Sequence, residues 1–416
     1  MTKAKEIDFD LIIVGGGMVG ASLACLLAET NLHIALVDRS LFDSSSKPFN
    51  DTELNFDARV SAITSASRKI FEDIGAWDKV KQVRCCAYTK MQVWDADGTG
   101  SIDFSADDIN QTELGFIVEN SVTLSCLYDT LQRFDNVELI APSEVENMQS
   151  MQSADHAQTR LQLADGSYLT AKLVVGADGA NSKVRELGNF ATKEWDYGHN
   201  AIVCTVCTEH GHKNTALQRF IDTGPLAFLP LATGDGGSDQ HYCSIVWSCT
   251  PERAEQLFSL SDDEFTTELS SCIEHRLGRV EQTSERFSFP LRQRHAIDYV
   301  NGNVVLVGDA AHTIHPLAGQ GVNLGLLDAK VLAEEIITAL GNGRNYYEPS
   351  LLRRYQRKRI GHNLGMMYLM EGFKYLFGEQ TLPLRWLRNI GMSGADNLPL
   401  VKNQLARKAM GLDWNN

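Results

Sequence analysis

Several features that would define a function class are missing from this sequence of 416 residues. No run approaches 18 consecutive apolar residues, so the sequence predicts no membrane-spanning helix. Lys and Arg number 38 against 53 Asp and Glu, and the resulting net charge of −15 disfavours a nucleic-acid-binding protein. The absence of internal repeats and of low-complexity segments disfavours a repeat array or a disordered chain.

Signals for secretion are lacking as well. The apolar stretch that begins at Phe9 is too short, and too soon broken by glycine, to be a signal peptide. The nine cysteines form no short disulfide framework. We therefore expect a cytoplasmic protein with reduced thiols.

What is present is an ordinary globular composition, with 43% hydrophobic and 22% charged residues, in a chain long enough for two or three domains. Residues 9–14 predict a buried strand, residues 18–29 a helix and residues 33–37 a second strand. Such a βαβ unit implies a parallel sheet covered by helices. Asp97-Gly98 and Asp165-Gly166 each predict the turn of a hairpin.

The second half of the chain has a different pattern. Residues 195–290 predict mostly strands, with one helix near 251–276. Residues 304–307 return to the pattern of a parallel strand. Apolar spacing then predicts a long helix that begins near Val322 and stops at Gly341, and the remainder of the chain predicts amphipathic helices.

A glycine motif follows the first strand and opens the first helix. Gly15, Gly17 and Gly20 fit the G-x-G-x-x-G pattern, in which glycines let the backbone approach a pyrophosphate and the helix N-terminus offers free N–H groups. Asp38 ends the second strand, where its carboxylate is placed to accept from ribose hydroxyls. A tight turn without a ligand is the alternative, and the motif by itself does not separate NAD from FAD.

Two later motifs are ones that a plain NAD dehydrogenase does not need. Residues 174–185 read Val-Val-Gly-Ala-Asp-Gly-Ala-Asn-Ser-Lys-Val-Arg and follow a strand. Residues 305–312 read Val-Leu-Val-Gly-Asp-Ala-Ala-His and run into residues 316–325, Pro-Leu-Ala-Gly-Gln-Gly-Val-Asn-Leu-Gly. Together the three ordered motifs resemble those of the para-hydroxybenzoate hydroxylase class of FAD-dependent monooxygenases.

Within that class the chain is most similar, nearly end to end, to the bacterial ubiquinone-biosynthesis hydroxylases, and among them to the 2-polyprenylphenol 6-hydroxylase branch. One departure is Ser121, where many relatives carry arginine but this branch shares the serine. The segments that carry the resemblance include residues 117–122, 195–197, 226–231, 243–248 and 312–321.

The resemblance implies an α/β fold with a glutathione-reductase-like FAD-binding domain, a β-sheet substrate domain and a helical C-terminal region. The FAD-binding domain is expected to be discontinuous. The expected division is residues 1–80, 115–190 and 290–345 for the FAD-binding domain, 81–114 and 191–289 for the substrate domain, and 346–416 for the helical region.

The resemblance also implies residues that contact FAD. Asp309 would hydrogen-bond the ribityl chain, and the guanidinium of Arg59 would meet the phosphates, with a surface arginine as the alternative. N–H groups from Gly319 to Asn323 would face the flavin N1–C2=O edge, where negative charge develops on reduction. The full expected set is Gly15, Gly17, Met18, Val19, Gly20, Asp38, Arg39, Arg59, Asn120, Val145, Asp178, Gly308, Asp309, Pro316, Gly319, Gln320, Gly321, Val322 and Asn323.

The implied reaction begins when NAD(P)H reduces bound FAD. O2 then adds at flavin C4a, and the hydroperoxide delivers a hydroxyl group to the ring of a polyprenylphenol in ubiquinone biosynthesis. The sequence holds no second dinucleotide fingerprint, so the reductant binds transiently or acts from elsewhere, and only His312 is a candidate catalytic side chain. Hydroxylation of another ring position or of a soluble aromatic acid, and a non-catalytic FAD-containing scaffold, are the alternatives.

A metal site is not expected. Cys204, Cys207, His210 and His212 look like a metal-binding group, but a three-residue offset on a strand sends the two cysteines to opposite faces. His312 is expected to pack or to hydrogen-bond in its turn rather than to bind a metal.

The C-terminal region differs from the rest of the chain in charge. Residues 345–416 hold 11 Lys and Arg and 5 Asp and Glu, a net of +6, whereas the first 344 residues carry −21. The basic run 353–359 is either a solvated helix face or a surface that meets anionic lipid or an acidic partner. Expected partners are the polyprenylphenol and O2, without nucleic acid. Other ubiquinone-biosynthesis proteins, a peripheral membrane contact and a homo-oligomer are left open.

Overall fold

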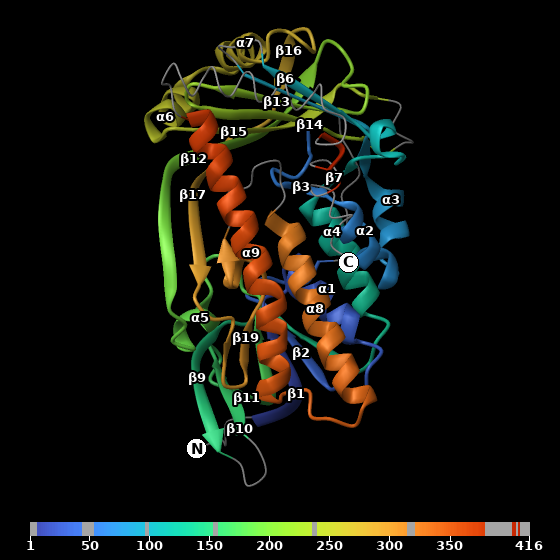
Figure 1. Cartoon of the computed structure of the whole chain (residues 1–416), viewed down its shortest axis with the longest axis vertical. Coiled ribbons are helices and arrows are strands. Elements are labelled where there is room, and N and C mark those ends of the chain that lie inside the picture. The colour runs from blue at the N-terminus through green and yellow to red at the C-terminus, as the bar shows by residue number, and fades with distance from the viewer. Residues whose placement is uncertain are drawn as a thin grey trace.

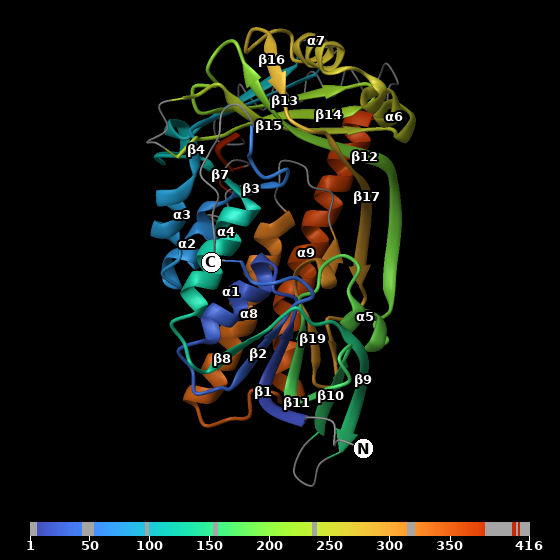
Figure 2. The same ribbon diagram turned by 180° about the vertical axis from the view of Figure 1, so that it is seen from behind.

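The structure is a computed structural model, and it describes residues 6–43, 54–95, 100–152, 157–234, 239–313, 321–378, 402–404 and 407. Figures 1 and 2 show a molecule with a parallel sheet toward one end of its long axis and a broad, mostly antiparallel sheet at the other. The long strands β12 (Thr192–Thr208) and β17 (Phe287–Ala296) and the helix α9 (Pro349–Gly378) run along this axis between the two ends.

The first sheet has eight strands, in the order β18-β19-β11-β1-β2-β8, and β10 and β9 extend it beside β11. β19, β11, β1, β2 and β8 are parallel, and the expected βαβ unit at residues 9–37 is present. The strands are β1 (Glu6–Val14), β2 (Ile34–Val37), β8 (Val137–Ile140), β9 (Val145–Gln152), β10 (Ala157–Leu163), β11 (Tyr168–Gly176), β18 (Val300–Asn301) and β19 (Val304–Leu306).

Helices cover this sheet because parallel strands require crossover connections. The helix α1 (Met18–Leu27) packs against α4 (Asn120–Leu131) and against α8 (Gly321–Gly341), and α8 packs against α9. The smaller helices are α2 (Ser65–Asp73), α3 (Trp77–Val83) and α5 (Lys183–Leu187). The predicted long helix is confirmed as α8, and Gly343, at φ +65°, follows its end.

The second sheet has nine strands, in the order β20-β17-β12-β15-β14-β13-β5-β6, with β16 beside β12. Its remaining strands are β5 (Lys90–Asp95), β6 (Ser101–Ser105), β13 (Thr215–Ile221), β14 (Gly224–Pro230), β15 (Tyr242–Cys249), β16 (Val280–Thr283) and β20 (His312–Thr313). β5 and β6, which flank the turn expected at Asp97-Gly98, pair as antiparallel strands, while the two turn residues themselves lie outside the described residues. The hairpin at Asp165-Gly166 pairs β10 with β11.

The single helix predicted near 251–276 was wrong, because the structure has two. The helix α6 (Pro251–Ser259) begins at Pro251 with Thr250 as its N-cap, and Leu260 then takes an extended conformation. The hydroxyl of Ser261 and the side chain of Glu264 form a capping box that starts α7 (Asp262–Cys272). The second of these start signals therefore divides the segment into two helices.

A small sheet of three strands, in the order β3-β7-β4, lies beside α2 and α4 (Figure 2). Its members are β3 (Val60–Ile63), β4 (Cys86–Tyr88) and β7 (Gly115–Glu119), and the short 3-10 helices are η1 (Asp107–Ile109) and η2 (Gly308–Ala310). Among the described residues, no helix has the length and apolarity needed to cross a bilayer. The expected division into domains stays a prediction.

Candidate cofactor site

The turn between β1 and α1, here called the glycine turn (residues 15–20), is built by close backbone packing. Gly15 has φ +106°, and a Cβ there would lie 2.4 Å from the carbonyl oxygen of Ala177. A Cβ on Gly20 would lie 1.9 Å from the carbonyl oxygen of Gly15. These two glycines are therefore required by the turn itself, and the expected contact of Gly15 with a ligand stays a prediction.

Gly17 differs from its neighbours because it faces open space. It is exposed, it is the N-cap of α1 with φ −59°, and a Cβ there would meet no atom of the described residues within 4 Å. The first N–H groups of α1, from Met18 onward, have no partner inside the helix, and they carry the positive end of the helix dipole. The space in front of α1 therefore fits an anionic group such as the pyrophosphate of a dinucleotide.

The peptide of Gly16 is fixed from both sides. Asp38 accepts hydrogen bonds from the N–H of Gly16 at 2.6 Å and from the N–H of Ser40 at 2.7 Å. The hydroxyl of Tyr128, on α4, donates to the carbonyl oxygen of Gly16 at 2.8 Å. Asp38 is half-buried, so its carboxylate keeps lone pairs for a ribose hydroxyl, and the adjacent Arg39 is exposed.

Arg59 lies at the start of β3, where backbone contacts join it to the N-terminus of α4. The N–H of Asn120 donates to the carbonyl oxygen of Arg59 at 3.0 Å, and the hydroxyl of Ser61 donates to the side chain of Asn120. The carboxylate of Asp57 accepts from the N–H groups of Arg59 and Ser121. The side chain of Arg59 is exposed, and its charge acts on Asp309, so the two expected cofactor residues lie near one another.

A buried ion pair supports this segment. Arg84 and Glu119 are 6% and 2% exposed, and Nε of Arg84 lies 2.7 Å from Oε2 of Glu119. The other oxygen of Glu119 accepts from the N–H of Asp57 at 2.7 Å. Sequence reasoning missed this pair. Glu119 occupies a position in a fully buried strand, where a carboxylate requires a partner, and that was the available signal.

The second motif is a cap for α5. The carboxylate of Asp178 accepts from the hydroxyl of Ser182 and from the N–H groups of Lys183 and Val184. Arg185 donates to the carbonyl oxygen of Ala310 at 2.9 Å, which joins this motif to the third one. Val145 is also placed by packing, since its side chain is 3% exposed within the main hydrophobic core.

The third motif forms a loop of residues 308–312, here called the Gly308 loop. Gly308 has φ +60° and packs against Val19 of α1, which also approaches Gly325 of α8. Asp309 is half-buried, and burial raises the pKa of its carboxyl while His312 and Arg59 act to lower it. The helix α1, the Gly308 loop and the helix α8 therefore meet at the point where the first and third motifs lie side by side.

The start of α8 lies beside the same region. The side chain of Asn323 donates to the carbonyl oxygen of Ala62 at 2.7 Å and accepts from the N–H of Thr64 at 3.1 Å, so it joins α8 to β3. Gly321 opens the helix, and within the part of the chain that the structure describes a Cβ there would meet no atom within 4 Å. Val322 is half-buried. Three further expected positions, Pro316, Gly319 and Gln320, lie outside the described residues.

His312 hydrogen-bonds within the protein, as expected for its turn. It is 1% exposed, and its Nε2 lies 2.5 Å from Oδ2 of Asp328 on α8. Sequence reasoning missed Asp328, although its place between Leu324 and Leu332, four residues from each, puts it on the buried face of a helix.

The basic run 353–359 is not one solvated face. Arg354 and Lys358 both pair with Glu335 of α8, and Arg359 is 5% exposed and pairs with Asp328. Arg359 follows Tyr355 by four residues and so shares its buried face. Only Arg353 and Arg357 of this run are exposed without an ion pair among the described residues.

The two cysteines of the suspected metal group face opposite sides of the sheet, as predicted. Cys204 packs with Trp247 and the helices α6 and α7, whereas Cys207 packs against Leu229 and Tyr242 on the other side. Both ring nitrogens of His212 make hydrogen bonds to the backbone. Within the described part of the chain, no group of three or more potential ligands is placed to hold a metal ion.

The sequence matches known proteins over most of its length. It is 35% identical over 406 residues to 3-demethoxyubiquinol 3-hydroxylase of Escherichia coli (strain K12), which covers 97% of this chain and 98% of that protein. It is 34% identical to the mitochondrial ubiquinone biosynthesis monooxygenase COQ6 of Xenopus tropicalis, over 95% of this chain and 92% of that one.

Solved structures show the same fold at lower identity. The crystal structure of PqsL, a probable FAD-dependent monooxygenase from Pseudomonas aeruginosa, has a TM-score of 0.75 at 22% identity and covers 93% of this chain and 100% of that one. The p-nitrophenol 4-monooxygenase PnpA of Pseudomonas putida DLL-E4 has a TM-score of 0.74 at 18% identity, with 98% of both chains covered. Residues 8–367 match the family model described as FAD binding domain, so this chain belongs to that family and is related to the ubiquinone-biosynthesis monooxygenases.

Proposed function

We propose that this protein is an FAD-dependent monooxygenase that hydroxylates the aromatic ring of a polyprenylphenol in ubiquinone biosynthesis. The single observation that carries the proposal is the open space at Gly17 in front of α1, beside which the glycine turn and the Gly308 loop pack together. Relatives at 34–35% identity that carry the names of ubiquinone-pathway oxygenases support the substrate class.

Different residues of this chain are proposed to bind different parts of the cofactor. The N-terminus of α1 would face the pyrophosphate, Asp38 would receive a ribose, and Arg59 and Asp309 would contact the phosphates and the ribityl chain. The N-terminus of α8 would present its positive dipole end to the flavin ring, where reduction would add negative charge. Bound FAD supplies the transfer of electrons from NAD(P)H to O2 and of one oxygen atom to the substrate.

The direct test is an oxygen-labelling assay. The purified protein is expected to be yellow, to release FAD on denaturation, and to incorporate one atom from labelled O2 into a short-chain prenylphenol when NAD(P)H or a reducing partner is supplied. Consumption of NAD(P)H that yields only peroxide would support a non-catalytic scaffold. A protein that binds NAD but no flavin after reconstitution would refute the proposal.

The ring position is a narrower question. The sequence segments resemble the 2-polyprenylphenol 6-hydroxylase branch, while the relative at 35% identity is named a 3-demethoxyubiquinol 3-hydroxylase. Profiling the quinone intermediates in a cell that lacks this protein decides between them, because the accumulated intermediate lacks the hydroxyl group that the enzyme adds. Accumulation of a soluble aromatic acid instead would favour the other substrate class.

The basic C-terminal region is proposed to bring the protein to its apolar substrate. Each buried CH2 of a polyprenyl tail contributes about 0.8 kcal/mol, so the substrate partitions to a membrane or to a lipid-carrying partner. Arg353 and Arg357 are exposed charges of α9 that make no ion pair among the described residues, so they are available for such a contact. A double variant, Arg353→Glu with Arg357→Glu, is expected to retain FAD and short-chain activity in vitro and to lose long-chain hydroxylation in cells.

Equal loss of both activities in this double variant would show that α9 only supports folding. Unchanged activity on both substrates would return these arginines to a solvated helix face. Arg359 is excluded from the test because it is buried and paired with Asp328, so its reversal would disrupt the interior.

A further inference from the structure

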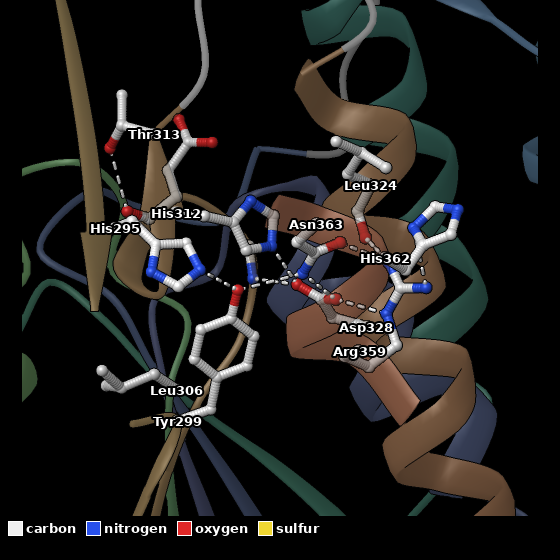
Figure 3. Close-up of polar contacts among 12 residues, drawn as sticks. His295, Tyr299, Leu306, His312, Thr313, Leu324, Asp328, Arg359, His362 and Asn363 are labelled. Atoms are coloured by element: carbon white, nitrogen blue, oxygen red, sulfur yellow. Dashed lines mark hydrogen bonds and ion pairs between the residues drawn. The ribbon is translucent and has the colours of Figure 1, made fainter. Parts of the chain in front are cut away.

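One buried carboxylate lies between the Gly308 loop and the C-terminal helix. Figure 3 shows Asp328, on α8, with His312 on one side and Arg359 and Asn363 of α9 on the other. Its Oδ2 accepts from the N–H of Gly308 at 3.0 Å and lies 2.5 Å from Nε2 of His312. Its Oδ1 accepts from Nε of Arg359 at 2.7 Å and from the side-chain nitrogen of Asn363 at 3.1 Å.

This carboxylate is charged in spite of its burial. Asp328 and Asn363 are 0% exposed, and burial alone would raise the pKa of Asp328. His312 and Arg359 outweigh burial and hold that pKa well below its usual range. Removing Arg359 would deprive this buried carboxylate of its permanently charged partner, and the surrounding groups would have to move to compensate for the loss.

The α9 side of the carboxylate is itself held in place by further contacts. Arg359 also donates to the carbonyl oxygen of Leu324 at 3.2 Å and to the side-chain oxygen of Asn363 at 2.8 Å. Asn363 donates to the hydroxyl of Tyr299 at 3.2 Å, and that hydroxyl lies 3.0 Å from Nε2 of His295. The position of α9 is therefore transmitted to Asp328 through a connected set of buried groups.

We propose that Asp328, Arg359 and Asn363 are positioning residues for the cofactor, through which α9 sets the conformation of the Gly308 loop. None of the three is assigned a contact with FAD. They act through Gly308 and His312, which flank Asp309, so a change at α9 alters the placement of the side chain expected to bind the ribityl chain. The proposal rests on the proposed function only in that the Gly308 loop contacts FAD.

The coupling is reciprocal by thermodynamic necessity. If the α9 contacts strengthen FAD binding by some factor, FAD binding strengthens the α9 contacts by the same factor. This consequence separates positioning from a purely structural role, because a structural contact would stabilise the apoprotein and the holoprotein equally and leave cofactor affinity unchanged.

The experiment compares two variants of Arg359 with one control variant of Arg354, because both arginines join α9 to α8. Arg359→Met removes the positive charge next to Asp328. Arg359→Lys keeps this charge but loses the planar guanidinium with its several N–H donors. Arg354→Met is the control, since Arg354 joins α9 to Glu335 of α8 without touching the Gly308 loop. The apoproteins are titrated with FAD, and the dissociation constant is measured by quenching of flavin fluorescence.

Arg359→Met is expected to raise the FAD dissociation constant about tenfold or more, within the range typical of coupling between sites. Arg359→Lys should lie between this variant and the parent, and Arg354→Met should match the parent. Unchanged affinity in folded Arg359→Met would overturn the proposal. Should that variant fail to fold, Asn363→Leu, which removes one donor to Asp328, replaces it under the same expectation.

Hydrogen exchange supplies the second readout. In the parent, FAD is expected to slow amide exchange in α9 around Asn363 more than in α7, which packs on the distant nine-stranded sheet. This difference should disappear in Arg359→Met and persist in Arg354→Met. Equal protection of α7 and α9 in the parent would contradict the coupling, whereas failure of the parent to bind FAD would instead refute the proposed function.

Discussion

The glycine turn and the Gly308 loop hold the same candidate site by different means. The glycine turn is made of backbone in close contact, and a Cβ added at Gly15 or Gly20 would collide with a carbonyl group. The Gly308 loop depends on side chains that come from α8 and α9, later in the sequence. Both segments are readable as motifs in the sequence, but they depend on different contacts. The glycines of the first are required by close backbone contacts, whereas the side chains that support the Gly308 loop lie outside its own motif, so the loop responds to changes on α8 and α9.

The largest expected effect separates two glycines within the glycine turn. Gly15→Val should destabilise the apoprotein by about 3 kcal/mol or more, because φ +106° strains an L residue and the Cβ would lie 2.4 Å from the carbonyl oxygen of Ala177. Gly17→Val should cost only about 1 kcal/mol, because valine is a poorer N-cap than glycine, and should still abolish FAD binding, because its side chain fills the open space before α1. Thermal unfolding of the apoproteins and their flavin content are the measurements.

Stoichiometric flavin in the Gly17→Val variant would place the pyrophosphate elsewhere. Equal destabilisation by the two substitutions would mean that the turn does not distinguish packing glycines from a ligand-facing one.

The substitution Asp309→Ala tests the contribution of the Gly308 loop to FAD binding. Loss of one hydrogen-bonding carboxylate is expected to weaken FAD binding by about 1.5–3 kcal/mol, which is less than the loss expected from Gly17→Val. The fold should persist, since Asp309 is half-buried. FAD titration of the apoprotein measures the effect, and Asp135→Ala at an exposed position is the control. An unchanged dissociation constant would remove Asp309 from the ribityl chain.

The sequence predicted those parts of the structure that are set by short segments of the chain. The βαβ unit, the two hairpins and the limits of α8 are set by apolar period, turn residues and glycine, all within short windows. The break between α6 and α7 was also local, in Pro251 and the capping box at Ser261, and was overlooked.

The contacts of Asp328 with Arg359 could not be predicted in the same way. Arg359 sits in a run of basic residues that indicates a solvated face, and only the three-dimensional packing of α9 on α8 turns this one side chain inward. Partners of a buried charge come from elements distant in sequence, and a single sequence does not pair them. The network around the Gly308 loop therefore required the structure.

A pH dependence should arise from the same network. Burial lowers the pKa of His295 to about 4, whereas an unfolded chain has a histidine pKa of about 6.5. Between these values the unfolded state binds the proton and the folded state does not, so stability falls as the pH falls. His295 alone should cost about 2 kcal/mol between pH 7 and pH 5.

Urea unfolding at pH 7 and pH 5 measures this change. His295→Gln should reduce the dependence without removing it, because the pKa values of His212 and His362 are lowered by burial as well. An identical loss of stability on acidification in the variant and the parent would show that His295 is protonated in the folded protein.

The smallest effects are expected at the cysteines of β12 in the nine-stranded sheet, which lie outside both the glycine turn and the Gly308 loop. Cys207 is half-buried, so Cys207→Ser should change the free energy of unfolding by less than about 1 kcal/mol. Cys204 is 1% exposed on the opposite face, and Cys204→Ser should cost about 1–3 kcal/mol because the hydroxyl is buried in an apolar cluster. Both variants should retain FAD affinity, and chelators should leave activity intact. Equal losses of stability at the two positions, together with stoichiometric metal in the parent protein, would show that both cysteines bind the same metal ion. That result would contradict their placement on opposite faces of the sheet.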